Sequence, residues 1–333
     1  MSIVLTGDRP TGPLHLGHYI GSLKNRLDLQ HKHQMYIMIA DTQALTDYFD
    51  RPQFVRDNIW QIAQDYLAIG LDACDIFIQS TIKALPELTM YYMNLVTLAR
   101  VTRNPTVKAE LKQKASKESF EQSAPCGFVC YPISQAADIT CVQAELIPVG
   151  IDQLPMIEQA NEIVRKFNSM YKTDVLKESQ AILSETSRLI GIDGNAKASK
   201  SLNNCIFLID SPDVVKQKVM SMYTDPNHIR VSDPGNVKNN VVFHYLEAFY
   251  EDKEDLAAMK AHYKKGGLGD VTIKQKLIGI LENILEPIRE RRSKIKQTDV
   301  EAIVYAGCKK ASKTAHEVLY KVKEAMHLNF DIN

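Results

Sequence analysis

Short apolar runs recur through the first half of the chain, and a longer stretch separates each run from the next. The runs lie at residues 2–6, 35–40, 75–79 and 144–150. Residues 53–69 instead repeat apolar side chains at the helical period, at Phe54, Ile59, Ile62, Tyr66 and Ile69. Strands that are apolar on both faces and alternate with helices are typical of a buried parallel sheet. We therefore predict an α/β domain with a Rossmann-like, doubly wound parallel sheet over residues 1–195.

The second half of the chain has a different pattern. After about residue 195 the strand signal fades, apart from the short apolar run at 205–209. Residues 196–304 are predicted to form an all-helical C-terminal domain, with loops near Pro226, Pro234 and residues 265–269. The segment 300–326 predicts a long helix with apolar positions at Ile303, Val304, Ala311 and Val318. The pattern allows this last helix, about residues 305–333, to pack either on its own domain or back on the first.

Composition narrows the class of protein. The chain has 333 residues, 45% of them hydrophobic, and a formal net charge of zero, so it is not a strongly basic DNA-binding protein of the histone kind. Its six cysteines lack the paired spacing of a zinc site, which favours reduced thiols inside the cell. No leader pattern and no membrane-length apolar stretch stands out, so we expect a cytoplasmic protein.

The stretch TGPLHLGHY, residues 11–19, follows the first predicted strand. A turn from strand to helix exposes backbone N–H groups at the positive end of the helix dipole, which attract anions. Gly17 leaves room beside the backbone, and His15 and His18 are three positions apart, on one side of a helix. Two imidazoles there can donate hydrogen bonds to a phosphate that gains charge during a reaction. The alternative is that both are ordinary, partly exposed histidines.

A second polar cluster is KASKS, residues 197–201. Two lysines with interleaved serines on a polar loop suit a polyphosphate, because ammonium groups supply charge and hydroxyls donate hydrogen bonds. Taken alone, the cluster is also what a solvated surface loop looks like. Its value comes from the pairing, since HxGH after the first strand and KxSKS after the last strand rarely occur together by chance.

Together these motifs resemble the two signatures of the class I aminoacyl-tRNA synthetases, and the chain between them is similar to bacterial tryptophanyl-tRNA synthetases. The resemblance implies ATP, Mg²⁺ held through the ATP phosphates, L-tryptophan and tRNA(Trp) as ligands, and a homodimer without membrane or DNA partners. It also implies an anticodon-binding role for the helical domain. The matching blocks, in order, are GDRPTGPLHLGHYIGSL (7–23), YPISQAADI (131–139), IPVGIDQLPMIEQANEI (147–163), KASKS, residues 223–236 and KKGGLGD (264–270).

The resemblance implies roles for individual residues. The expected catalytic residues are His15, His18, Lys197 and Lys200. The expected ATP-binding residues are Arg9, Pro10, Thr11, Gly17, His18, Gly150, Ile151, Asp152, Leu189, Lys197, Ala198, Ser199, Lys200 and Ser201. The expected tryptophan-binding residues are Leu5, Gln43, Tyr131, Gln135, Asp138 and Gln153.

Asp138 is expected to accept a hydrogen bond from the indole N–H of tryptophan. Indole N–H is a donor with no acceptor capacity, so a site for it needs one buried acceptor. A carboxylate there also disfavours analogues without the N–H, because the charge would stay buried and unpaired. Without the resemblance, the residues favour the alternative that Asp138 is a carboxylate capping or pairing within a helix.

The chain also departs from the commoner bacterial pattern around the substrate. It has Leu5 for an aromatic residue, Arg9 for glutamine, His18 for asparagine, Gln43 for histidine and Ala198 for methionine. This combination resembles the second, auxiliary type of bacterial tryptophanyl enzyme. We hypothesise altered sensitivity to tryptophan analogues, and equal binding of an indole inhibitor by wild type and Gln43→His would contradict it.

Two lysine- and arginine-rich runs, 107–117 and 288–296, suit RNA phosphates, although such runs are usually solvated helix faces. KKGGLGD predicts a turn between helices rather than a phosphate loop, since no strand precedes it. The alternatives to a tryptophanyl enzyme are a tyrosyl-tRNA synthetase, a small HxGH nucleotidylyltransferase and a synthetase-derived binding protein without catalysis. Asp138 and the intact signatures favour a tryptophanyl enzyme over these alternatives.

Overall fold

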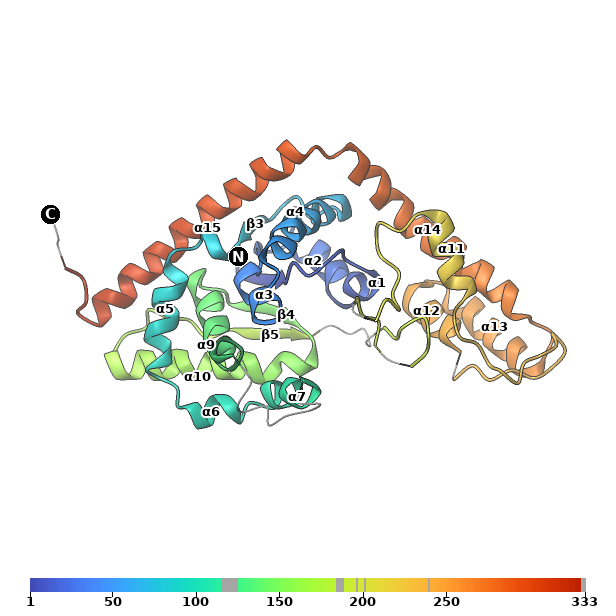
Figure 1. Cartoon of the computed structure of the whole chain (residues 1–333), viewed down its shortest axis with the longest axis horizontal. Helices are drawn as coiled ribbons and strands as arrows, with labels where there is room; N and C mark the ends of the chain where they lie inside the picture. The colour runs from blue at the N-terminus through green and yellow to red at the C-terminus, as the bar shows by residue number, and fades with distance from the viewer. Residues whose placement is uncertain (115–124, 184–188, 196, 201, 239, 331–333) are drawn as a thin grey trace.

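The computed structural model describes residues 1–333 except 115–124, 184–188, 196, 201, 239 and 331–333. Figure 1 shows a body built around a sheet, a helical lobe beside it and a long pair of helices that joins the two. The apolar core runs without a break through both parts. The α/β prediction for the first part and the helical prediction for the second are confirmed, whereas the division into domains at particular residues stays a prediction.

A five-stranded parallel sheet forms the centre of the body, in the order β3-β2-β1-β4-β5. The four predicted strands are present, and β5 is a further strand that the apolar pattern does not predict. Its residues are partly exposed, because β5 is the edge strand. The strands are β1 (Ile3–Asp8), β2 (Gln34–Ile39), β3 (Asp75–Ile78), β4 (Leu146–Val149) and β5 (Gln180–Leu183).

Helices flank the sheet. The helix predicted at 53–69 is α4, with Ile59, Ile62, Tyr66 and Ile69 buried as expected, whereas Phe54 is exposed at its first turn. The helical elements of the body are α1 (Leu16–His18), η1 (Tyr19–Leu23), α2 (Lys24–Leu29), α3 (Asp41–Tyr48), α4 (Pro52–Ile69), η2 (Gln79–Thr81), α5 (Ala84–Met93), α6 (Leu98–Thr102), α7 (Pro105–Lys114), α9 (Cys126–Cys141), η3 (Ile151–Gln153) and α10 (Leu154–Tyr171).

The helical lobe follows the KASKS segment. KKGGLGD is the turn between α13 and α14, as predicted, and the short apolar run at 205–209 contributes only an isolated bridge between Phe207 and His15. The remaining helices are α11 (Pro212–Met220), α12 (Val241–Phe249), α13 (Lys253–Lys265), α14 (Asp270–Lys294) and α15 (Gln297–Ala325).

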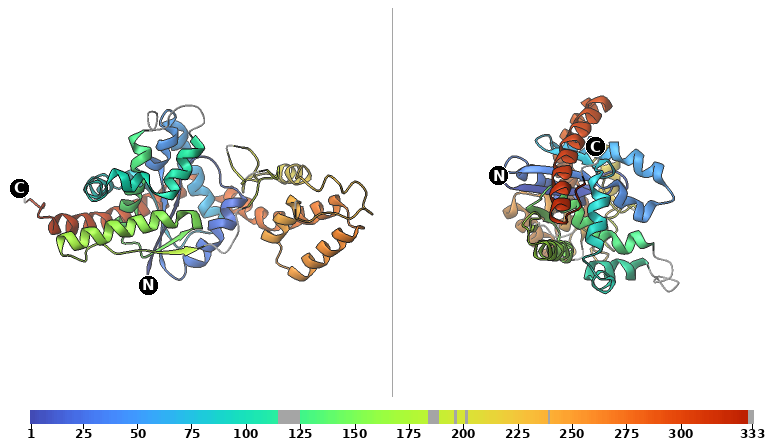
Figure 2. Two further views of the ribbon diagram at one scale, coloured as in Figure 1. Left: turned by 90° about the horizontal axis from the view of Figure 1, so that it is seen from below. Right: turned by 90° about the vertical axis from the view of Figure 1, so that its left-hand side faces the viewer.

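The last helix, α15, returns to the body and packs along β3 (Figures 1 and 2). Gly307 makes this possible, since a Cβ there would lie 2.0 Å from the carbonyl oxygen of Ile76. At the next residue of α15, the thiol of Cys308 accepts a hydrogen bond from the backbone N–H of Ile78 at 3.3 Å. The face of α15 that is buried includes Val304, Ala311 and Val318 as predicted, but Ile303 is 40% exposed.

The end of α14 docks on α4, so two basic side chains of the run 288–296 have partners within the protein, and an RNA surface along the rest of the run stays a prediction. Arg292 donates through Nε to Asp65 at 2.8 Å, and Arg291 donates through Nε to the carbonyl of Ala68 at 2.6 Å. Asp65 is 1% exposed and also accepts a hydrogen bond from the backbone N–H of Leu14. These guanidinium groups therefore serve to hold the helical lobe to the body, beside the HLGH stretch.

We expect Arg292→Ala to lower the free energy of unfolding by about 3 kcal/mol, because removal of one partner leaves a buried carboxylate without its cation. Urea unfolding at constant m-value measures the change. Arg165→Ala is the matched control: Arg165 pairs with Glu158 and Glu178, but all three side chains are about half exposed, so a loss below about 1 kcal/mol is expected. Equal losses in the two variants would contradict the prediction.

Candidate functional site

The strand order places a topological switch point between β1 and β4. From β1 the chain moves outward to β2 and β3, and then crosses back to build β4 and β5 on the other side. Ligands of open α/β sheets bind in the crevice beyond the carboxyl ends of the strands at such a point. A cavity of about 360 Å³ lies there, lined by the ends of β1 and β4 and by side chains of α3, α7 and α9.

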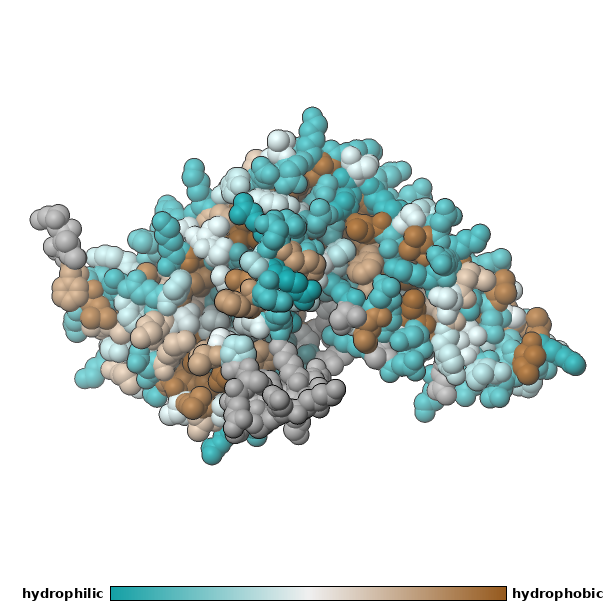
Figure 3. Space-filling view, in the orientation of Figure 1, coloured by the Kyte–Doolittle hydropathy of each residue, from teal (hydrophilic) through white to brown (hydrophobic). Residues whose placement is uncertain are grey.

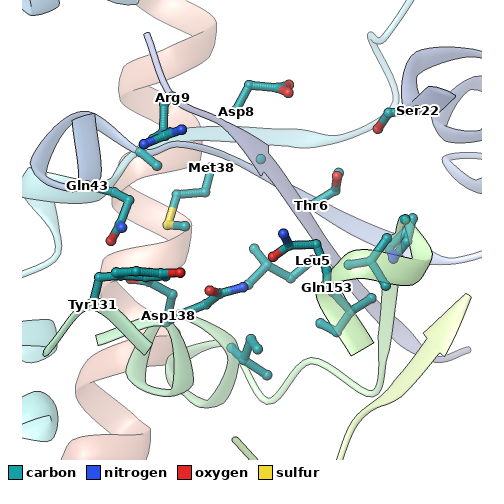
Figure 4. A pocket seen from close by; sticks show the side chains of 18 of the residues that line it. Leu5, Thr6, Asp8, Arg9, Ser22, Met38, Gln43, Tyr131, Asp138 and Gln153 are labelled. Atoms are coloured by element: carbon teal, nitrogen blue, oxygen red, sulfur yellow. The ribbon is translucent and has the colours of Figure 1, made fainter. Parts of the chain in front are cut away.

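All six predicted tryptophan-binding residues line this one cavity. Figure 4 shows five of them around it, from β1, α3, α9 and η3. Side chains that are 148 positions apart along the chain are thus brought together by the sheet. The six are Leu5, Gln43, Tyr131, Gln135, Asp138 and Gln153.

Asp138 is buried on α9 and is held by a residue that the sequence reading missed. Nε2 of Gln79 lies 2.9 Å from both carboxylate oxygens of Asp138. Oε1 of Gln79 accepts the backbone N–H of Gln43 at 3.0 Å, so the amide is oriented. Gln79 directly follows β3, and the rule that singled out HLGH, a polar residue at the carboxyl end of a strand, could have found it.

Burial also changes the charge of Asp138. Loss of solvation raises its pKa from 3.8 to about 7, and the hydrogen bond from Gln79 opposes this rise. No basic side chain pairs with Asp138 among the described residues. The carboxyl group is therefore a strong acceptor in a nearly apolar surround, and a ligand that donates one hydrogen bond to it would stabilise the ionised form.

His15 and His18 come together at the start of α1, with ring centroids 3.9 Å apart. His15 is the N-cap of this short helix, and its Nδ1 accepts the backbone N–H of Gly17 at 3.0 Å. Nδ1 of His18 accepts the backbone N–H of His15 at 3.2 Å. A neutral imidazole that accepts at Nδ1 carries its proton on Nε2, so each ring keeps one N–H to donate.

Both histidines are neutral near pH 7. Burial, with the charges of Lys200 and Lys197 nearby, lowers the pKa of His15 to about 2. Burial lowers the pKa of His18 to about 4, against the opposing effect of Asp8. The rings are thus suited to hydrogen-bond donation rather than to proton transfer.

The KASKS segment lies directly against the HLGH stretch. Nζ of Lys200 donates to the carbonyl of Gly12 at 2.7 Å, and the backbone of Leu16 donates to Ile206 at 2.9 Å. A Cβ added to Gly17 would lie 2.8 Å from the His15 ring and 3.8 Å from Cβ of Ala198, so this glycine lets the two segments meet. The two predicted signature motifs therefore form one surface, although about 180 positions separate them in the sequence.

The two signature lysines differ in their surroundings. Lys200 is partly buried, and burial lowers its pKa, with Asp8 and Asp65 opposing the effect. Lys197 is exposed, and Ser201 lies outside the described residues. Of these two lysines, Lys200 alone donates a hydrogen bond to the TGPLHLGHY stretch within the described part of the chain, at the carbonyl of Gly12.

The matches to known proteins agree with this geometry. Residues 1–286 match the family model described as tRNA synthetases class I (W and Y). The chain belongs to this family. The synthetase is 56% identical to the tryptophan–tRNA ligase of Streptococcus mutans, over 98% of both chains. It is 54% identical to the tryptophan–tRNA ligase of Clostridium longisporum, over 98% of this chain and 97% of the relative.

A solved structure supports the same assignment. The tryptophanyl-tRNA synthetase of Campylobacter jejuni, complexed with ADP and tryptophan, matches the synthetase with a TM-score of 0.84 at 28% identity. The match covers 98% of this chain and 100% of that chain. The predicted fold class, and the prediction of an enzyme of the aminoacyl-tRNA synthetase class, are confirmed. No helix among the described residues is both long and apolar enough to cross a membrane.

Beneath the HLGH stretch the synthetase holds a buried ion pair that the sequence reading also missed. Nη1 of Arg26 donates to Oδ2 of Asp8 at 2.7 Å, and the hydroxyl of Tyr66 donates to the same oxygen at 2.6 Å. Burial raises the pKa of the Asp8 carboxyl, but the charge of Arg26 and the hydrogen bonds from Arg26 and Tyr66 outweigh it and hold this pKa well below its usual range. Asp8, the last residue of β1, is thus an anion that is paired with Arg26.

The remaining predicted ATP residues lie in three places. Arg9 and Gly150 line the cavity, where Arg9 is ion-paired with Asp47 at 2.7 Å. Ile151 and Asp152 are exposed at η3, beside the cavity rather than in its lining. The others lie in or beside the two signature segments: Pro10 and Thr11 precede Gly12, the carbonyl of Leu189 accepts the backbone N–H of Ala198, and the N–H of Ser199 donates to Asn204.

Proposed function

We propose that the chain ligates L-tryptophan to tRNA(Trp), with ATP converted to AMP and pyrophosphate through a tryptophanyl-adenylate. The observation that carries this proposal is Asp138, a buried acceptor with no cationic partner among the described residues, in a cavity at the carboxyl ends of β1 and β4. Near-full-length relatives that are tryptophan–tRNA ligases confirm the reading over the tyrosyl and non-catalytic alternatives. ATP as a substrate is supported by the ADP in the Campylobacter jejuni relative.

The chemistry needs no nucleophile from the protein. The carboxylate of tryptophan attacks the α-phosphorus of ATP, a P–O bond forms, and the bond to pyrophosphate breaks. Nε2–H groups of His15 and His18 donate to phosphate oxygens that gain charge, and Lys197 and Lys200 neutralise the departing pyrophosphate. Lys200 would exchange its bond to Gly12 for this contact, which requires a closing movement of the KASKS segment.

The proposal includes Mg²⁺ bound through the ATP phosphates. The charge of Asp8 acts on both histidines, and its Oδ2 already accepts hydrogen bonds from Arg26 and Tyr66. Phosphate oxygens are therefore better candidates for ligands than protein groups. The ion would supply positive charge to the phosphates when bound.

A homodimer and a tRNA surface complete the proposal. Support for a dimer comes from exposed apolar side chains in the region of α5 and α6, where Figure 3 shows apolar surface. These are Met90, Met93 and Leu98, which are 60%, 38% and 72% exposed. The helical lobe would contact the anticodon, and a reaction that consumes ATP and tRNA is expected in the cytoplasm.

Amino-acid-dependent exchange of pyrophosphate into ATP, run with all twenty amino acids, tests the function. Exchange with tryptophan only is expected, since Asp138 selects the indole N–H. A tyrosyl enzyme would exchange with tyrosine, and a synthetase-derived binding protein would exchange with none. A small nucleotidylyltransferase would show no dependence on any amino acid.

The KM for tryptophan should rise about tenfold between pH 8 and pH 6. Asp138, with its pKa raised to about 7, is mostly ionised at pH 8 and mostly protonated at pH 6, and the carboxylate is the better acceptor. His15 and His18 stay neutral across this range, because their pKa values are about 2 and 4, so kcat should not follow their titration. Exchange kinetics at each pH measure both values, and a pH-independent KM would contradict the assignment.

A further inference from the structure

The cavity contains five charged side chains among the described residues, and four of them have an assigned partner or a proposed ligand. Asp8 pairs with Arg26, Arg9 pairs with Asp47, and Asp138 is bound by Gln79 and expected to accept the indole N–H. The fifth is Glu110, on α7. Its position inside a lysine-rich run hid it in the sequence.

Glu110 contacts the cavity through another lining residue. Its Oε2 accepts a hydrogen bond from the hydroxyl of Tyr131 at 3.0 Å. Burial, together with the charge of Glu110, raises the pKa of Tyr131 above its usual range, so the phenol keeps its proton and donates. No cation pairs with Glu110 among the residues that the structure describes, and no second hydrogen bond reaches its other oxygen, Oε1, there.

We propose that Glu110 binds the α-ammonium group of the amino acid substrate, an inference that rests on the proposed function. The substrate is a zwitterion, and its ammonium has three N–H donors that need acceptors when water is excluded. Of the anions in the cavity, Asp8 is neutralised by Arg26 and Asp138 is expected at the indole. Glu110 supplies the missing negative charge, and its Oε1 accepts a charge-assisted hydrogen bond from the ammonium, which directs the substrate carboxylate toward ATP.

The contact between Glu110 and the substrate ammonium would also make the site selective for ligands that carry an ammonium group. Asp138 and Tyr131 are on the same face of α9, seven positions apart, or about two turns of helix. Figure 4 shows both side chains directed into the cavity. A ligand with an indole at one end and an ammonium at the other spans the two carboxylates, whereas an indole acid without the ammonium meets Glu110 as a repulsive charge.

Glu110→Gln tests this proposal because it keeps the size and hydrogen-bonding reach of the side chain but removes the charge. In pyrophosphate exchange we expect the KM for tryptophan to rise about 10- to 100-fold, with the KM for ATP within about twofold of wild type. Glu162→Gln is the matched control, since Glu162 on α10 is paired with Arg100 and does not line the cavity. It should leave both values unchanged.

Two ligands distinguish ammonium binding from a general loss of shape. L-Tryptophanamide has the ammonium and indole-3-propionate lacks it. Glu110→Gln should weaken inhibition by the amide by the same factor as it raises the KM, and leave inhibition by the acid unchanged or stronger. Equal weakening of both ligands would overturn the proposal.

A double mutant separates direct contact from a role through Tyr131. If Glu110 only orients the phenol, Glu110→Gln adds no loss in a Tyr131→Phe background, and the proposal fails. If Glu110 binds the substrate, most of the loss remains in that background, and Glu110→Asp recovers part of it because the charge is kept.

Should Glu110→Gln fail to fold, Glu110→Asp is tested with the same two ligands. Weaker inhibition by the amide alone would then support the proposal, and equal weakening of both ligands would overturn it. Wild type without tryptophan-dependent exchange would instead refute the proposed function itself.

Discussion

Asp138→Ala is expected to lower kcat/KM for tryptophan about 100-fold in pyrophosphate exchange. The substitution removes the acceptor that the indole N–H requires, and it leaves the amide of Gln79 without its partner. The indole is remote from the reacting phosphate, so most of the loss should be in KM rather than in kcat.

Asp75→Ala is the control for this substitution. Asp75 also lies at the sheet, but it pairs with Lys310 on the surface, and less than about a threefold change in kcat/KM is expected. Asp138→Asn should fall between alanine and wild type, because its amide oxygen still accepts one hydrogen bond. Wild-type kcat/KM in Asp138→Ala would show that another group binds the indole.

Lys200→Ala is expected to lower kcat for the activation step by about 100- to 1,000-fold, with a smaller effect on the KM for tryptophan. The ammonium of Lys200 is already placed against the HLGH stretch, 2.7 Å from the carbonyl of Gly12, while its burial makes the charge more effective than one in water. The lysine would leave this carbonyl for the pyrophosphate as charge develops on it. Single-turnover formation of the adenylate measures the step directly.

Lys216→Ala gives the comparison for Lys200. Lys216 is an exposed lysine on α11, in the same lobe, and its removal changes the net charge equally without touching the signature segments. Its kcat should stay at the wild-type value. If Lys200→Ala retained the same kcat, the close approach of the two motifs would have no part in the chemistry.

The acceptor at Asp138 has a thermodynamic cost. Its folded-state pKa of about 7 lies above the ordinary 3.8, so between these values the folded protein binds more protons at this group than the unfolded chain does. The contribution of Asp138 to the free energy of unfolding therefore falls as pH rises from about 4 to about 7. A buried carboxylate without a cation is an unfavourable choice for a fold alone, which is consistent with a role in binding.

Periodicity and local motifs predict much of the fold correctly. Strands buried on both faces are marked by continuous apolar runs, which is why β1 to β4 are visible in the sequence. The short edge strand β5 is partly exposed and has no such run, so its pattern carries no signal. Phe54 and Ile303 fall on the apolar period of α4 and α15, yet both side chains are exposed to solvent.

Some functional residues follow from the sequence because short motifs keep their spacing. The HLGH stretch and KASKS are each contiguous, and they identify the family without any structure. Other functional residues contact partners that are far away along the chain, and such single contacts leave no pattern in the sequence. These are Gln79, Asp8 and Arg26. Glu110 was hidden because its neighbours in sequence are lysines, whereas its neighbour in space is Tyr131.

The sequence by itself determined the fold class, the family and the order of the apolar strands, since these depend on local period and contiguous motifs. Tertiary structure alone decided that α15 returns to β3 through Gly307 and that Arg292 is ion-paired with Asp65. It also decided that Asp138 and Glu110, among the described carboxylates of the cavity, have no cationic partner. The physical reason is that the period of apolar residues indicates which face of an element is buried, but not which element packs against that face. The pairing of charged side chains depends on that packing partner.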